Sequence, residues 1–341
     1  MKPPLVSIIL PYRNVSNEID HCLTSIKNQT LKDWELVAID DGSTDDSFDL
    51  LSSASKSDSR IQIYRSPGDG IVDALNLGLK VSRSPLVARM DGDDKMMPSR
   101  LQKQCSFLKE NPGVGLVSSQ VTYRSVTPEI STSGFMHYVE WSNDVLTEEE
   151  IELSQFEESP VVHPSVMFRK DVIIKKGGYH KGPFPEDYEL WLRCLSMGVT
   201  FHKIQERLLE WVDSGKRASR MQPQYSRDAF QFTKALYLGS WLSRKGIVGK
   251  SLSAWGAGKV ARNQATFLSQ NDLHIERFYD IDPAKIGRSI EGAPVVSIVD
   301  IYPRDQEFLL ILSGARSIKP KIKTFLNERK LIRGKHYLFL A

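Results

Sequence analysis

Two short acidic clusters are the residues of this chain with the clearest chemical potential. Asp40–Ser43 reads Asp-Asp-Gly-Ser, and Asp91–Asp94 reads Asp-Gly-Asp-Asp. Each cluster alone is typical of a turn or a helix cap. Together they would crowd carboxylates that repel one another unless a cation or a donor-rich ligand lies between them. Oxygen ligands without His or Cys favour Mg²⁺ or Mn²⁺ over zinc, with a nucleotide diphosphate as the natural partner.

Alternating strand and helix patterns in the first hundred residues would position these clusters. Strand-like apolar runs are separated by helical stripes such as Ile19, Cys22, Leu23 and Ile26, which predicts a parallel sheet with right-handed crossovers. Ligands of such sheets bind outside the carboxyl ends of the strands, which is where both clusters lie. The predicted strands are Leu5–Leu10, Trp34–Ile39, Ile61–Tyr64 and Leu86–Met90.

The middle of the chain adds a third acidic feature. The helical pattern over Glu186–Ser196 begins with two carboxylates directly after Pro185, where the helix dipole would stabilise their negative charge. Residues 145–158 carry six glutamates, which indicates a mobile or surface helix, either a solvated face or a lid. A helix over 98–110 and β structure over 114–126 and 160–169 complete this region.

Composition limits the class of protein. The 341 residues predict two domains, and 40% hydrophobic with 26% charged residues is ordinary for a globular protein. No apolar run reaches the ~20 residues of a membrane span, and no secretory signal is recognisable. Three dispersed cysteines fit a reducing, cytoplasmic setting. Residues 241–341 hold 17 Lys/Arg against 9 Asp/Glu, which indicates either a solvated surface or a face that contacts an anionic membrane. The basic residues do not form the dense block that would indicate nucleic-acid binding.

A second, smaller α/β unit follows a linker or helical arm. Strand patterns at 251–255, 275–279 and 308–312 alternate with helical patterns at 259–269 and 319–329. Gly256-Ala-Gly258-Lys-Val-Ala follows the first strand, and Asp280 ends the second, as in a dinucleotide-binding fingerprint. The unit has about half the length of a full dinucleotide domain, so a structural or docking role and true nucleotide binding both remain open.

Five ordered segments carry a family resemblance over residues 4–215. The segments are VSIILPYRN, ELVAIDDGSTD, GIVDALNLGL, PLVARMDGDDKMMPSRLQKQ and PEDYELWLR. With these segments the chain resembles the inverting glycosyltransferases of family 2, which have a GT-A fold, here with a C-terminal Rossmann-like accessory domain. This implies a mostly parallel α/β sheet flanked by helices in residues 1–215, an arm or linker over 216–246 and a Rossmann-like domain over 247–341.

The resemblance also implies functional residues. Asp91 and Asp93 match the D-x-D pair that binds Mn²⁺ or Mg²⁺, and Asp187 matches the general base, with Glu186 beside it. The implied reaction is metal-dependent, inverting transfer of a sugar from a nucleotide-sugar, most simply a UDP-sugar, to a hydroxyl of a glycan or lipid-linked glycan. The implied donor-binding residues are Pro11, Arg13, Asp40, Asp41, Asn76 and Asp91.

Departures from the family pattern leave some roles open. The chain has Arg13 inserted before Asn14, and it lacks a histidine after the catalytic helix, so Arg217 or Arg220 could clamp the diphosphate instead. His163 lies in a family-like segment, where it could serve the acceptor or be structural. The expected setting is surface-polysaccharide synthesis in the cytoplasm, with peripheral contact at the inner face of the membrane left open. The alternatives are a nicotinamide-dependent oxidoreductase built on the Gly256–Asp280 unit, or an inactive nucleotide-sugar-binding protein.

Overall fold

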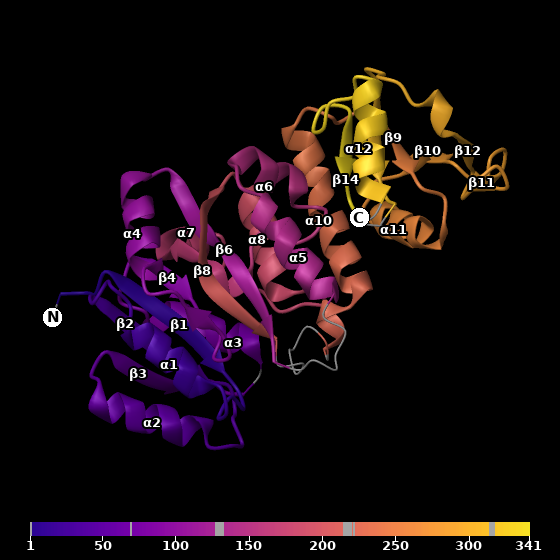
Figure 1. Cartoon of the computed structure of the whole chain (residues 1–341). Helices are drawn as coiled ribbons and strands as arrows, with labels where there is room; N and C mark the ends of the chain where they lie inside the picture. Colours follow the sequence, from indigo (N-terminus) through magenta and orange to yellow (C-terminus); the bar gives the residue numbers. More distant parts are fainter. Residues whose placement is uncertain (1, 69, 127–132, 214–219, 221, 314–317) are drawn as a thin grey trace. The chain divides into compact units, whose positions relative to one another are not determined.

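The chain divides into two compact units (Figure 1). The first comprises Met1–Ile151 and Pro160–Tyr225, and the second comprises Glu152–Ser159 and Ser226–Ala341. No helix in the part of the chain that the structure describes is both long and apolar enough to cross a membrane. The computed structural model describes residues 2–68, 70–126, 133–213, 220, 222–313 and 318–341.

The first unit is built on an eight-stranded sheet in the order β3-β2-β1-β4-β7-β6-β8-β5. The strands β3, β2, β1 and β4 pair in parallel, which confirms the parallel sheet expected from the first hundred residues. The strand bounds are β1 Val6–Tyr12, β2 Trp34–Asp40, β3 Ile61–Arg65, β4 Leu86–Arg89, β5 Lys95–Met96, β6 Val114–Ser125, β7 Met167–Arg169 and β8 Thr200–Asp213.

Helices cover both faces of the parallel half, which explains its continuous apolar strands. Every residue of β1 is buried. Alternate side chains of the strand point to opposite faces, so Ile8 packs in one core cluster with Cys22 of α1. Ile9 packs in another cluster with Leu75 and Leu79 of α3. The helices of this unit are α1 Ile19–Lys27, α2 Ser47–Ser57, α3 Ile71–Val81, α4 Arg100–Glu110, α5 Ser133–Asp144, α6 Glu148–Ser154, α7 Lys170–Lys175 and α8 Glu186–Ser196, with a 3₁₀ turn at His163–Ser165.

The other half of the first sheet is mixed. Strand β7 lies antiparallel between β4 and β6, and the long strand β8 runs parallel to β6. The sequence pattern did not predict β8. Charged side chains such as Glu206, Arg207 and Glu210 interrupt the alternation of apolar and polar residues by which a strand is recognised. The pairing of β8 with the short β5 brings the end of this strand to the segment that follows Asp91–Asp94.

The second unit holds a six-stranded sheet in the order β11-β12-β10-β9-β13-β14. Its strands pair in parallel except for the short β11. The first strand, β9, lies inside the sheet, so the strand order reverses between β9 and β13. The bounds are β9 Ser251–Trp255, β10 Ile275–Asp280, β11 Ser289–Ile290, β12 Ala293–Ser297, β13 Glu307–Ile311, β14 Tyr337–Phe339, α10 Arg227–Arg244, α11 Lys259–Ser269 and α12 Lys319–Glu328, with a 3₁₀ turn at Ile298–Asp300. A further 3₁₀ turn, Pro223–Tyr225, ends the first unit.

The glutamate-rich segment 145–158 differs from the expected solvated helix or lid. Only residues 147–150 are exposed, whereas Val145, Leu146 and residues 151–158 are partly or fully buried. Phe156 is fully buried against Trp241 of α10, with ring centroids 6.1 Å apart. Glu157 is 2% exposed and forms ion pairs with Lys319 and Arg333. The segment 152–159 is therefore part of the second unit's core.

Candidate active site

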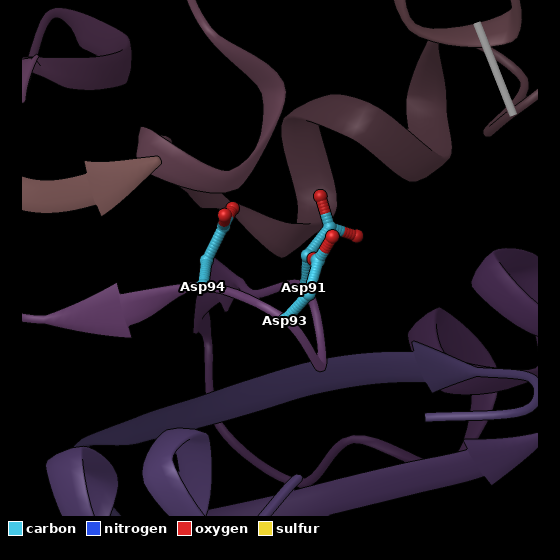
Figure 2. A group of neighbouring side chains, drawn as sticks. All are labelled: Asp91, Asp93 and Asp94. Carbon is cyan, nitrogen blue, oxygen red and sulfur yellow. The ribbon is translucent and has the colours of Figure 1, made fainter. Parts of the chain in front are cut away.

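Three aspartates gather in the turn after β4 (Figure 2). Carboxylate oxygens of Asp91, Asp93 and Asp94 all lie within 4.8 Å of one another. Asp94 is buried, and it accepts a hydrogen bond from the backbone N–H of Val212 at 2.8 Å, which anchors the turn to β8. Asp91 and Asp93 are partly exposed. A compact set of hard oxygen atoms, open on one side, suits Mg²⁺ or Mn²⁺.

A buried arginine at the end of β4 forms an ion pair with this cluster. Arg89, the last residue of β4, is 3% exposed and forms an ion pair with Asp91. Although burial works against the charge, the carboxylate of Asp91 raises the pKa of Arg89 above its ordinary value. The Arg89 cation thus stays charged inside the protein and fixes the orientation of Asp91. Nothing in the local spacing of the sequence singled out this residue.

The catalytic helix expected from the sequence is α8, and it places Asp187 in its first turn. The Asp187 carboxylate accepts a hydrogen bond from the N–H of Tyr188 at 2.7 Å and keeps 22% of its side chain exposed. The neighbouring Glu186 is almost fully buried, and the hydroxyl of Tyr225 donates to it at 2.6 Å. The two carboxylates therefore differ: Asp187 is accessible, whereas Glu186 is enclosed by the protein.

Electrostatics connect this helix with the aspartate cluster. Burial raises the pKa of Asp187, and the charge of Asp91 raises it further, while Arg89 lowers it. Burial and the charge of Asp187 raise the pKa of Glu186. The same Arg89 cation therefore acts on Asp91 and on both carboxylates of α8. A carboxylate with a raised pKa is a stronger base, which suits proton abstraction near neutral pH.

His163 lies next to these carboxylates but is not a charged partner. Its ring is buried, and Nε2 lies 2.9 Å from the hydroxyl of Tyr179. Its Nδ1 lies 3.9 Å from the Asp187 carboxylate. Burial, aided by Arg89, holds the pKa of His163 well below its usual range, so the imidazole is neutral. Packing against Tyr179 and Trp191 favours the structural role left open by the sequence.

The loops after β1 and β2 lie at the carboxyl ends of two adjacent parallel strands of the first sheet. The register pairs Tyr12 with Asp40, so the two strands end side by side. Asp40 accepts a hydrogen bond from the N–H of Ser43 at 3.1 Å, and Asp41 accepts one from Gly70 at 3.3 Å. Burial raises the pKa of Asp41, whereas the nearby Arg13 cation lowers it. Pro11 is buried within β1, whereas Arg13 is exposed at its end.

Two residues expected to touch the donor are occupied by the protein itself. The side-chain amide of Asn76 donates to the carbonyl of Tyr179 at 2.8 Å and accepts from its N–H at 2.9 Å. Arg220 pairs with the buried Asp213 at 2.5 Å. The amide of Asn76 and the guanidinium of Arg220 thus each contact another part of the protein. Arg217 lies outside the described residues.

The glycine-rich loop of the second unit is closed by its own acid. Asp280 accepts hydrogen bonds from the N–H of Ala257 at 2.8 Å and of Asp282 at 2.9 Å, and it pairs with Lys285 at 3.2 Å. Although burial opposes it, these donors hold the pKa of Asp280 below its usual range. Gly256, with φ +117°, makes the turn, and Gly258 precedes α11. Both Asp280 oxygens are thus engaged within the chain.

Comparison with known proteins finds glycosyltransferases among the relatives of this chain. The chain is 29% identical over 226 residues to the O-antigen biosynthesis glycosyltransferase WbnJ of Escherichia coli, covering 65% of this chain and 84% of WbnJ. It is 32% identical over 212 residues to the amylovoran biosynthesis glycosyltransferase AmsE of Erwinia amylovora, covering 60% of this chain and 74% of AmsE.

The fold is also that of a solved structure. S. aureus TarS residues 1–349, determined in complex with UDP-GlcNAc, superposes with a TM-score of 0.55 at 14% identity, over 77% of this chain and 71% of that one. This likeness confirms the GT-A fold expected for the first unit. The model of glycosyl transferase family 2 matches residues 7–177, which include the aspartate cluster after β4. The chain belongs to glycosyl transferase family 2 and is a glycosyltransferase.

Proposed function

We propose that this enzyme transfers a sugar from a nucleotide-diphosphate sugar to a hydroxyl acceptor, with a divalent metal ion and inversion at the anomeric carbon. The observation that supports this most is a shared electrostatic environment. Asp187 and Asp91 interact with the same buried Arg89, although they come from α8 and from the turn after β4. A base and an acidic cluster that could hold a metal thus serve one reaction centre.

The metal would be held by Asp91 and Asp93. Asp94 holds the turn in place through its contact with Val212. When bound, Mn²⁺ or Mg²⁺ acts as a Lewis acid on the diphosphate leaving group. The chain contributes a turn in which Gly92 lies close to Val15, since a Cβ at Gly92 would lie 3.2 Å from the Val15 side chain.

Asp187 would act as the general base. It would accept the proton of the acceptor hydroxyl at its carboxylate as that oxygen attacks the anomeric carbon, so that a single displacement inverts the configuration. The hydrogen bond from the Tyr188 N–H and the packing of His163 hold the carboxylate in place. Glu186, bonded to Tyr225, orients the start of the helix from inside the protein.

The donor nucleotide would bind at the ends of β1 and β2. Asp40, Asp41 and Arg13 lie there, offering acceptors for base and ribose donors and one cation for phosphate. A UDP-sugar is favoured, since the structurally similar TarS was determined with UDP-GlcNAc. WbnJ and AmsE are named for O-antigen and amylovoran biosynthesis, so a growing surface glycan or its lipid-linked precursor is the proposed acceptor.

The Asp187→Asn variant tests the proposal. Asparagine keeps the size of the side chain but cannot accept the proton, so kcat should fall about 10²–10⁴-fold. Donor KM should change little, because Asp187 faces the acceptor. Asp171→Asn, in an exposed pair with Lys175 on α7, is the matched control and should keep wild-type kcat.

The product's anomeric configuration, followed by NMR, gives a second readout. The expected product has the opposite configuration to the donor. A retained configuration, or near wild-type transfer by Asp187→Asn, would refute the mechanism. Donor binding with neither transfer nor donor hydrolysis by the wild type would instead identify an inactive binding protein.

A further inference from the structure

Three neighbouring loops of the second unit each expose one large apolar side chain. They precede β9, β13 and β14, which are adjacent strands of the parallel sheet, so all three loops lie at its amino-terminal edge. Val248 is 72% exposed, Tyr302 55% and Ile332 56%. Single exposed apolar residues are ordinary, but three on adjacent loops at one sheet edge require an explanation.

Contacts between the loops show that these residues share a surface. Ser251, at the start of β9, donates its N–H to the carbonyl of Gln306 in the second loop. Tyr302 and His336 line the same small pocket, which joins the second and third loops. Lys250 of the first loop and Asp305 of the second both act on the charge of His336. The three loops therefore form one continuous edge.

The edge is strongly basic around its apolar residues. The loops 246–250, 302–306 and 329–336 contain a single acid, Asp305. Arg304 pairs with Glu307, and Arg333 pairs with Glu157. Among the described residues, no ion partner neutralises Lys250, Lys330 or Lys335. The six basic residues of these loops are Lys250, Arg304, Arg329, Lys330, Arg333 and Lys335.

We propose that this edge, formed by loops 246–250, 302–306 and 329–336, docks on an anionic phospholipid surface. Apolar side chains that project from a basic surface enter the boundary between headgroups and acyl chains while the lysines stay at the anionic headgroups. Each lysine near such a surface adds attraction that salt screens. The proposal concerns the second unit and does not depend on the reaction assigned to the first.

Co-sedimentation of the full-length protein with vesicles tests the proposal. We expect binding to vesicles of phosphatidylcholine mixed with phosphatidylglycerol, little binding to phosphatidylcholine alone, and weakening by salt. Lys330→Glu and Lys335→Glu should each lower the partition coefficient about fivefold or more. Val248→Ser and Ile332→Ser should together lower it about tenfold or more.

Matched controls come from the opposite edge of the same sheet. Ile281, 68% exposed after β10, and the exposed Lys321, at the start of α12, follow the carboxyl ends of their strands. Ile281→Ser and Lys321→Glu should keep wild-type binding. Equal losses in the test and control variants, or no binding of the wild type to anionic vesicles, would overturn the proposal.

A second copy of the chain is the alternative occupant of this edge. In that case, light scattering without lipid would show a dimer that Val248→Ser with Ile332→Ser converts to a monomer, and the lipid proposal would be wrong. Sugar transfer to a soluble acceptor by these variants, at the wild-type rate, would show that the surface and the reaction are separate.

Discussion

The two sheets of this protein each place aspartate side chains at the carboxyl end of a parallel strand, but the carboxylates have different surroundings. In the first unit, Asp91 and Asp93 remain partly exposed beside a buried arginine. In the second unit, Asp280 is 6% exposed and accepts two backbone hydrogen bonds as well as a lysine ion pair. The first pair of carboxylates is partly accessible to a ligand, whereas the carboxylate in the second unit is almost fully buried and closes a loop.

This difference shows that a sequence motif alone does not reveal which contacts its side chains make in the folded protein. Gly256 and Asp280 match a dinucleotide fingerprint in spacing, and Asp91 and Asp93 match a metal-binding pair in spacing. Spacing specifies which loop a carboxylate lies in. The donors within its own chain decide whether that carboxylate can still bind a ligand. The three predictions below alter one side of the comparison at a time.

The largest effect is expected for Asp93→Ala. A metal ion contributes several kcal/mol to stabilisation of the leaving group, so its loss should lower kcat/KM about 10³-fold or more. Donor turnover and Mn²⁺ titration followed by a change in donor affinity are the measurements. Asp282→Ala, an exposed aspartate near the glycine loop of the second unit, is the matched control and should keep wild-type turnover. Unchanged Mn²⁺-dependent donor binding in Asp93→Ala would remove Asp93 from the metal site.

A smaller effect, on stability alone, is expected for Asp280→Ala. The substitution leaves the buried N–H of Ala257 without its acceptor, which costs about 1–3 kcal/mol. Urea unfolding should report this loss, while the donor turnover of the folded protein should stay at the wild-type value. Wild-type stability with impaired turnover would contradict the structural role and would bring the glycine loop into the reaction.

The smallest effect is expected for Tyr225→Phe. The Tyr225 hydroxyl stabilises the charged form of Glu186, so its removal should raise the pKa of the Glu186–Asp187 pair further. Activity requires the deprotonated base, so the pH below which kcat/KM falls should move upward, by about one pH unit or less. The pH profile of kcat/KM is the measurement, and Tyr64→Phe is the control. A profile that moves downward or stays in place would show that Tyr225 does not act on this pair.

Much of the fold was accessible from the sequence because its signals are local. The buried runs of β1 and β2, and the apolar stripe of α1, predicted the parallel sheet. Strand β8 was missed because its charged residues mask any alternation. The segment around Phe156 and Glu157 was misjudged because its partners, such as Trp241 and Arg333, lie far along the chain. No local pattern carries that information.

Some residues of the candidate site were also predictable from the sequence, whereas others depend on tertiary contacts. The sequence pointed to Asp91, Asp93 and Asp187, and the structure places the two elements that carry them around Arg89. It could not identify Arg89 or Tyr225, which are single residues in a strand and in a short turn. It also could not show that Asn76 and Arg220 have partners within the protein, because those partners, Tyr179 and Asp213, are set by tertiary contacts.

The participation of residues 152–159 in the second unit has a consequence for synthesis. Glu157 meets Arg333 only after 176 further residues have been made. At about 5–20 residues per second, this delay is on the order of ten seconds or more. Lys234, too, donates hydrogen bonds to the carbonyls of both Glu157 and Leu340. The nascent chain therefore carries an unpaired Glu157 until Lys319 and Arg333 have been made, so a ribosome stalled before these residues would expose this carboxylate to chaperones.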